Sequence, residues 1–126
     1  MRVDLEKIKK VILVDGLVDW VSIISPLFAA RQILGGAGER EALPLAIQAV
    51  KELLREGLIL VGETSRRGFE PWTGSLASIE QRLDWEAKNI EFPVRFGDIC
   101  WIDNTERGEQ MANHVMKTEP DILDDQ

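Results

Sequence analysis

The most constraining feature of this sequence is the stretch from Leu43 to Trp72, which carries the signals of a helix followed by two antiparallel strands. Its first half has apolar residues at helical spacing on more than one side, which predicts a helix that packs against several neighbours. Gly57 ends that helix, and the apolar run 58–61 predicts a strand. Residues 64–68 have the composition of a turn, so residues 69–72 can return beside the first strand. This unit predicts a mixed α+β domain.

Two further helices and a short strand are predicted before this unit. Residues 4–14 have an apolar and a charged face, which is typical of an amphipathic helix. Residues 20–24 predict a strand, and residues 25–34 a second helix, with the Ser25 hydroxyl as its N-cap. A single helix from Leu17 to Leu34, kinked at Pro26, is the alternative. The residue before a proline is pushed out of the helical region, which favours a break.

The C-terminal part predicts a helix, a strand and a last helix. Ser75 is expected to cap the first of these, and Leu83 to lie on its apolar side. Residues 98–103 read as a strand. Thr105 then caps a helix over residues 106–116.

Several side chains in this part have an expected direction. Phe92 and Phe96 are predicted to anchor a linker to the core, and Met111 and Val115 to face inward from the last helix. Residues 117–126 contain four acids and a proline, which predicts a flexible acidic tail. The expected division is therefore one domain over residues 1–116 and a tail over residues 117–126.

The element order over residues 4–72 resembles that of the winged helix-turn-helix family. The run from Glu52 to Ile59 is similar to the end of that family's third helix as it enters the second strand. The resemblance implies a winged-helix-like core of helices and a small antiparallel sheet, with a C-terminal helix-strand-helix addition. The family has members that bind DNA and members that bind only proteins, so the likeness leaves function open.

A second resemblance is to short, uncharacterised bacterial proteins. It rests on the segment 97–105 with Gly108 after it, and on the return strand 68–72. Proteins of this size and acidity include immunity proteins of bacterial toxin systems. The size and acidity of the chain, rather than the likeness itself, therefore make a toxin inhibitor one expected class.

Composition and charge restrict the partners. A chain of 126 residues with 44% hydrophobic and 29% charged residues suits one folded domain. The net charge of −7 disfavours nucleic acid and anionic membrane as partners and favours a basic protein, although acidity can also serve solubility alone. The N-terminal segment lacks the pattern of a secretion signal and no apolar run is long enough to span a bilayer, so we expect a cytoplasmic protein. The oligomeric state is left open.

No constellation of residues predicts catalysis, a metal or a cofactor. His114 is the single histidine and has no second imidazole or thiol near it in sequence. Cys100 is the single cysteine, and its apolar neighbours predict a small buried side chain. The glycine-rich segment 35–38 lacks the lysine of a phosphate loop and predicts a flexible connector. We therefore expect a protein that is not an enzyme and holds no cofactor.

The four tryptophans each have an acidic residue within two positions, which suits binding of a basic protein as well as core packing. Charge mimicry of a polyanionic substrate, with a tryptophan as anchor, is the expected mechanism. The residues predicted to bind the partner are Asp84, Trp85, Glu86, Asp103 and Glu106.

Binding of DNA is the alternative hypothesis. In it, Gln48 on the third helix contacts base edges, and Arg66 and Arg67 in the wing contact phosphates. The segment 39–57 has three positive and four negative side chains, however, and a helix that reads DNA rarely has that balance.

Overall fold

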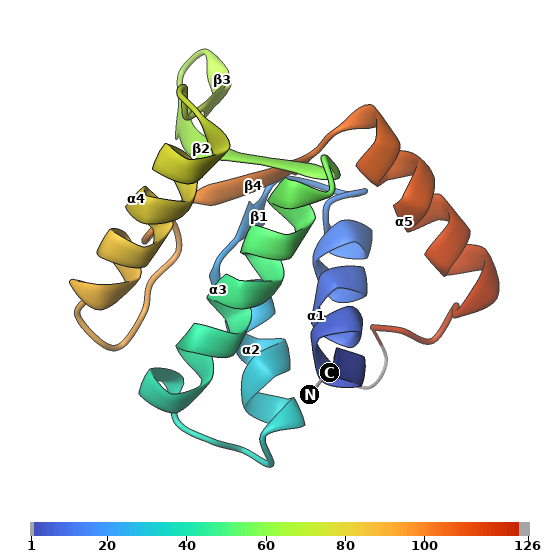
Figure 1. Cartoon of the computed structure of the whole chain (residues 1–126). Coiled ribbons are helices and arrows are strands. Elements are labelled where there is room, and N and C mark those ends of the chain that lie inside the picture. Colours follow the sequence, from blue (N-terminus) through green and yellow to red (C-terminus); the bar gives the residue numbers. More distant parts are fainter. Residues whose placement is uncertain (1, 124–126) are drawn as a thin grey trace.

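The structure, a computed structural model, describes residues 2–123 and has the predicted α+β class (Figure 1). The element order also agrees with the sequence-based expectation. The helices within these residues are α1 (Arg2–Asp15), α2 (Ile24–Ile33), α3 (Glu39–Arg55), α4 (Leu76–Lys88) and α5 (Glu106–Thr118). The strands are β1 (Val21–Ser22), β2 (Ile59–Ser65), β3 (Gly68–Pro71) and β4 (Trp101–Asn104).

The four strands form one antiparallel sheet in the order β1-β4-β2-β3. β2 and β3 make the predicted hairpin, with Thr64 opposite Phe69. β4 comes last in sequence yet lies between β1 and β2, with Ile102 paired to Val21 on one side and to Val61 on the other. The C-terminal segment is therefore not an appendage to a finished sheet, because it supplies one of the two inner strands.

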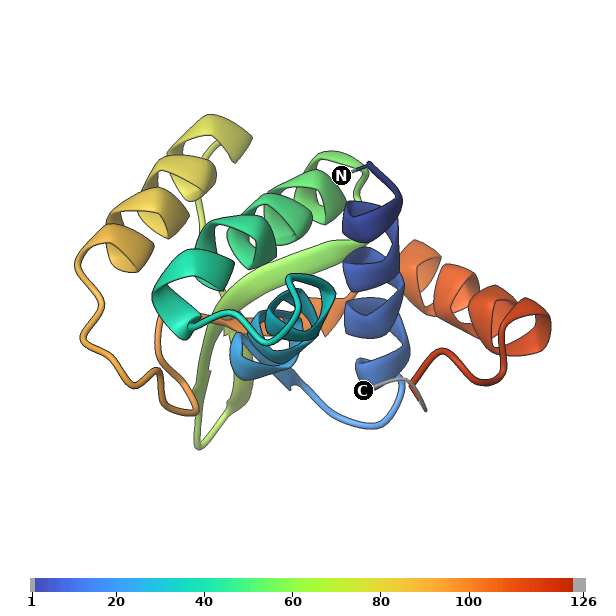
Figure 2. The same ribbon diagram turned by 90° about the horizontal axis from the view of Figure 1, so that it is seen from below.

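The helices are distributed unevenly around this sheet. α1, α2 and α3 pack against one another, α5 packs against α1, and α4 packs against α3 (Figures 1 and 2). α4 and α5 consequently lie at opposite ends of the molecule. Gly108 lets α5 come close to the start of β2, since a Cβ there would lie 1.9 Å from the Leu58 carbonyl oxygen.

One apolar core joins the N-terminal helices to the C-terminal strand and helices. Each large side chain buried in it stabilises the fold by roughly 1.5–3 kcal/mol relative to exposure. Within α4, which is described in full, Leu83 is the one buried residue and holds this helix to the core. Large side chains with almost no exposure are Leu5, Ile8, Ile12, Leu53, Ile59 and Ile102.

Two of the three predicted N-caps are confirmed. The hydroxyls of Ser75 and Thr105 accept hydrogen bonds from backbone N–H groups at the starts of α4 and α5. Ser25, in contrast, is not a cap, because α2 begins one residue earlier and the Ser25 hydroxyl donates to the Asp15 carboxylate. The Ser22 hydroxyl oxygen instead accepts a hydrogen bond from the backbone N–H of Ile24, the first residue of α2. A strand and a separate helix are present rather than one kinked helix, but the boundary lies at Ile23, so Ile24 and Ser25 are helical and the predicted break directly before Pro26 is wrong.

Two predicted strands are shorter than expected. The first contains only Val21 and Ser22, because the chain turns into α2 directly after them. The second begins at Trp101 rather than Asp98. Ile99 has a φ of 69°, and a residue in the left-handed region cannot continue an extended strand.

Three expectations about side chains and the chain end need correction. Phe96 is 76% exposed and does not anchor the linker, whereas Phe92 packs against the core. Met111 is exposed on α5, and Ala112 takes the inward position with Val115. The segment expected to be a flexible tail from residue 117 includes the end of α5 and the buried Ile122; residues 124–126 lie outside the described residues. Apolar Ile122 can pack because the chain folds back after α5.

Candidate interaction surfaces

The four tryptophans differ in their availability to a partner. Trp72 is a core residue with 8% exposure, and the guanidinium of Arg82 lies 3.8 Å from the centroid of its ring. Trp101 is half-buried in β4. Trp20 and Trp85 are 38% and 62% exposed. These last two therefore remain as tryptophans that a partner could contact.

The acidic residues predicted to bind a partner are largely engaged within the protein. The Asp84 carboxylate accepts two hydrogen bonds from Lys51 Nζ, at 3.0 and 3.1 Å. The Glu86 carboxylate lies 4.0 Å from Arg82 Nε. Asp103 is half-buried in β4, where burial raises the pKa of its carboxyl group. The charges of Asp84 and Glu86 are therefore partly neutralised by cations of the same chain, and Asp103 is partly covered by it.

The predicted partner-binding set also does not form one surface. Asp84, Trp85 and Glu86 lie on α4, whereas Glu106 begins α5 at the opposite end of the molecule (Figure 1). Asp103 lies in an inner strand of the sheet between them. One partner of ordinary size does not cover both ends through a single compact interface.

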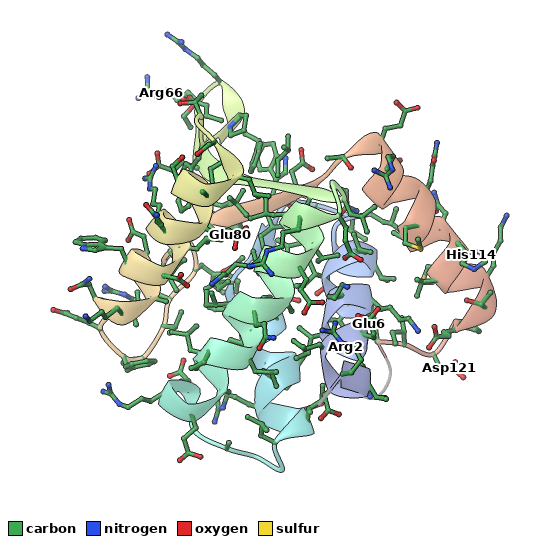
Figure 3. All side chains as sticks on the ribbon, in the orientation of Figure 1. Arg2, Glu6, Arg66, Glu80, His114 and Asp121 are labelled. Atoms are coloured by element: carbon green, nitrogen blue, oxygen red, sulfur yellow. The ribbon has the colours of Figure 1, made fainter. Side chains whose placement is uncertain are left out.

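The side of α3 that faces α1 carries an ionic cluster around a buried lysine. Lys9, only 6% exposed, has its Nζ 3.0 Å from Glu6, 3.3 Å from Glu52 and 2.8 Å from Glu56. Arg2 also binds Glu52, at 2.6 and 3.0 Å, and its hydrogen bond holds the pKa of that carboxyl below the ordinary value (Figure 3). Two of the acids that count against a cationic third helix thus face α1.

The opposite side of α3 is cationic and faces α4. The two helices run antiparallel, and two ion pairs connect them: Lys51 with Asp84, and Arg55 with Glu80 at 2.5 Å. Figure 3 shows Glu80 between the two helices. The hydrogen bond from Arg55 lowers the pKa of the Glu80 carboxyl. α4 therefore covers part of the face that would read DNA in the alternative hypothesis.

A groove of about 630 Å³ remains between α3 and α4, and we call it the cationic groove. Its cations are Arg40, Lys51, Arg55 and Lys88. Their partners among the described residues are two carboxylates, which leaves an excess of two positive charges. The guanidinium of Arg40 lies 4.6 Å from the centroid of the Phe92 ring, and this contact marks the far end of the groove from Arg55.

The residues predicted to bind DNA are separated by this arrangement. Gln48 is exposed on α3 and lines the cationic groove. Arg66 and Arg67 are exposed in the turn of the β2–β3 hairpin, where Figure 3 labels Arg66. The candidates for DNA contact therefore lie on separate elements, and of the three only Gln48 lines the groove.

A second hollow, of about 620 Å³, lies beside the loop between α1 and β1. Much of its lining is apolar and exposed, with Val18 at 90% and Phe96 at 76% exposure. We call it the aromatic cleft. Its principal apolar residues are Val18, Trp20, Ile24, Phe28, Phe96 and Leu123.

The charged residues that line the aromatic cleft are two aspartates. Asp15 accepts from the hydroxyl of Ser25, and Asp19 accepts from the backbone N–H of Trp20 at 2.7 Å. Neither forms an ion pair with a lysine or arginine of residues 2–123. The Trp20 ring packs on Phe69 of β3 with 6.3 Å between centroids, which fixes one wall. The cleft thus combines aromatic contact area with uncompensated negative charge.

Sequence reasoning found only part of this cleft. The pair of Trp20 and Asp19 fits the pattern of an aromatic next to an acid, but Val18, Phe28 and Phe96 did not enter the predicted site. Phe28 is 46% exposed on α2, next to the buried Leu27 and Ala29. α2 and residue 96 come together only in the folded chain, so no local sequence pattern predicts that they line the same cleft.

The single cysteine and the single histidine have different surroundings. Cys100 is buried, and burial raises the pKa of its thiol to about 12, so it is not a thiolate at neutral pH. His114 is exposed on α5 (Figure 3). Within residues 2–123, no three histidine, cysteine or acidic side chains are grouped to hold a metal ion.

None of the helices in the described part of the chain has the length and apolar character needed to span a bilayer. Comparisons with protein-family models, with curated proteins and with solved structures found no match for this chain. The case for a function therefore depends on the two hollows.

Proposed function

We propose that this chain is a non-enzymatic, cytoplasmic protein-interaction domain, and that it acts as an immunity-type inhibitor of a basic bacterial toxin. The observation that carries the proposal is the aromatic cleft, where exposed apolar side chains surround a hollow whose charged groups are both acidic. Exposed apolar area concentrated in one place is typical of a protein interaction site. The cleft replaces the α4 residues as the principal binding surface.

The chemistry of the cleft defines the segment that it accepts. An apolar side chain of the partner would enter between Trp20, Phe28 and Phe96, because aromatic pockets desolvate such anchors well. Lysine or arginine residues beside the anchor would meet Asp15 and Asp19. The net charge of −7 would increase the rate of encounter with a cationic partner and oppose polyanions.

The test is reconstitution with the proteins encoded by the genes on either side. Each is co-expressed with this chain, and complex formation is measured by co-elution and calorimetry. We expect one of them to be basic and to form a stable complex that lowers its toxicity. If neither neighbour binds, the immunity-type function is wrong.

Surface variants locate the interface. Replacing Val18 and Phe96 together by serine removes two exposed apolar side chains, so binding should weaken by about a hundredfold while thermal stability is retained. Trp85→Ala is the control, because Trp85 is also a largely exposed apolar residue but lies on α4. Loss of binding in the control alone would move the interface to α4.

A winged-helix DNA-binding regulator is the second candidate, and one observation favours it. The cations Lys51 and Arg55 lie on one side of α3 while Glu52 and Glu56 lie on another, so the helix has a positive face despite its balanced composition. In that case charge reversal of Arg66 and Arg67 should weaken DNA binding and flatten its dependence on salt. A promoter fragment that shows no salt-dependent shift would reject this candidate.

A further inference from the structure

We propose that the cationic groove between α3 and α4 binds a small organic anion that carries one acidic group on an apolar body. This site is separate from the aromatic cleft and does not depend on the proposed function. Its volume of about 630 Å³ lies within the range of small-molecule sites, roughly 300–1,000 Å³.

The groove contains more positive than negative charge. Lys51 and Arg55 are matched by carboxylates of α4, but no carboxylate of residues 2–123 lies within ion-pair distance of Arg40 or Lys88. These two cations line the same half of the groove, near Phe92. An anionic group placed between them would supply the missing negative charge.

The groove also has an apolar wall. Leu43, Pro44 and Ile47 line the groove from α3, and Ala87 lines it from α4. Phe92 holds the guanidinium of Arg40 over its ring, which restricts this side chain before any ligand arrives. A ligand with only a charged group leaves these apolar atoms in water, so an apolar body adds affinity.

Ion pairs between the two helices restrict one end of the groove. The ion pairs of Lys51 with Asp84 and of Arg55 with Glu80 hold the two helices together at one end of the groove. Gln48 lies in the middle and offers a donor and an acceptor to a polar substituent. A small molecule enters such a site, whereas a nucleic acid duplex would require α4 to separate from α3.

The experiment uses the full chain with three probes: 1-naphthyl phosphate, 1-naphthol and inorganic phosphate. Amide chemical shifts of isotopically labelled protein are followed during each titration. We expect 1-naphthyl phosphate to shift residues of α3 and α4 and the segment 88–92, with saturation. Its affinity should exceed that of either single-feature probe by at least about tenfold, because only this probe uses both charge and apolar surface.

Variants of the two unmatched cations complete the test. Arg40→Gln and Lys88→Gln should each weaken binding of 1-naphthyl phosphate by about three- to tenfold, and the double variant should abolish saturation. Lys88→Gln removes no contact that holds the fold, so a change in the stability of the Arg40 variant does not obscure the result. Arg66→Gln is the control with equal loss of charge, and binding should be unchanged.

Three outcomes would overturn the proposal. Equal affinity for 1-naphthol and 1-naphthyl phosphate would indicate a purely apolar surface. Shifts centred on the β2–β3 hairpin, or an equal effect of Arg66→Gln, would indicate diffuse attraction to positive charge. A short DNA duplex that shifts α3 and the hairpin together, and displaces the probe, would assign the groove to nucleic acid. None of these results depends on whether the aromatic cleft binds a protein.

Discussion

The aromatic cleft and the cationic groove are hollows of nearly equal volume with opposite charge. In the cleft, the hydrogen bonds of Asp15 and Asp19 within residues 2–123 come from uncharged groups, so their negative charge is available to a partner. In the groove, two of four cations are already bound by carboxylates of the neighbouring helix. The charge that a partner meets is therefore set by the element packed opposite each side chain.

This difference explains why the summed charge of the chain is a poor guide to its surfaces. A net charge of −7 is consistent with an acidic interaction surface, yet many of the acids are paired with cations of the same chain. Asp84 and Glu80 secure α4, and Glu52 and Glu56 secure α1. The predictions below test the independence of the two hollows.

The largest effect is expected from Leu83→Ala, which should affect the groove and spare the cleft. Leu83 is fully buried and is the apolar anchor of α4, so the free energy of unfolding should fall by about 2–5 kcal/mol. Hydrogen exchange should accelerate first in α4, and binding of 1-naphthyl phosphate should weaken. Leu76→Ala, at an exposed position of the same helix, is the control and should change little. Equal loosening of the α1–β1 loop would show that the hollows are coupled.

A change of charge at the cleft should have the next largest effect. Asp19→Lys reverses a carboxylate that has no cationic partner among the described residues, so affinity for a basic partner should fall by about tenfold, mainly through slower association. The effect should diminish at high salt. Arg40→Glu applies a change of the same size to the groove and should leave partner binding unaltered. A stronger effect of the groove variant would place the partner on α3 and α4.

A smaller effect concerns the carboxylate of Glu80. Arg55 lowers its pKa in the folded protein, so this pair stabilises the fold above the ordinary carboxyl pKa, and the contribution is lost as pH falls through the lowered value. Glu80→Gln should imitate that loss at neutral pH and increase affinity for 1-naphthyl phosphate by about threefold, because Arg55 becomes available. Urea unfolding of both proteins across the acid range checks the stability, and their curves should converge at low pH. Unchanged affinity would mean that Arg55 does not reach the ligand.

The smallest effect is predicted for Asp103→Asn. Burial raises the pKa of Asp103 in the folded state, so its charged form disfavours folding and stability should increase as pH falls through the raised value. The neutral amide should therefore stabilise the protein slightly at neutral pH, by no more than roughly 0.5 kcal/mol. Partner binding should not change, since Asp103 is not one of the residues that line the cleft. A clear loss of binding would restore Asp103 to the interface.

Local signals in the sequence predicted the helices, the hairpin and two N-caps correctly. Ser75 and Thr105 could be identified because a cap acts on backbone groups within three residues. Ser25 had the same local signal, but a carboxylate at Asp15 competed for its hydroxyl. The α+β class followed from element order alone.

The position of β4 and the composition of both hollows could not be predicted in the same way. The pairing of Ile102 with Val21 joins segments far apart in sequence, and no periodicity encodes it. Phe96 carried the signal of an anchor, yet it is exposed, whereas Ile122 carried the signal of a tail and is buried. The charge balance of the segment 39–57 could not show how these charges are distributed, since it added acids and bases that lie on different sides of α3.

The place of β4 in the sheet has a consequence for how the protein is made. While the ribosome is still synthesising the segment before Trp101, the edges of β1 and β2 that β4 will occupy have no partner. Pairing across such long sequence separations is slow and leaves strand edges open to other chains. A nascent chain therefore cannot complete its sheet until β4 has emerged, and shortening it before that strand should yield an aggregating product rather than a smaller domain.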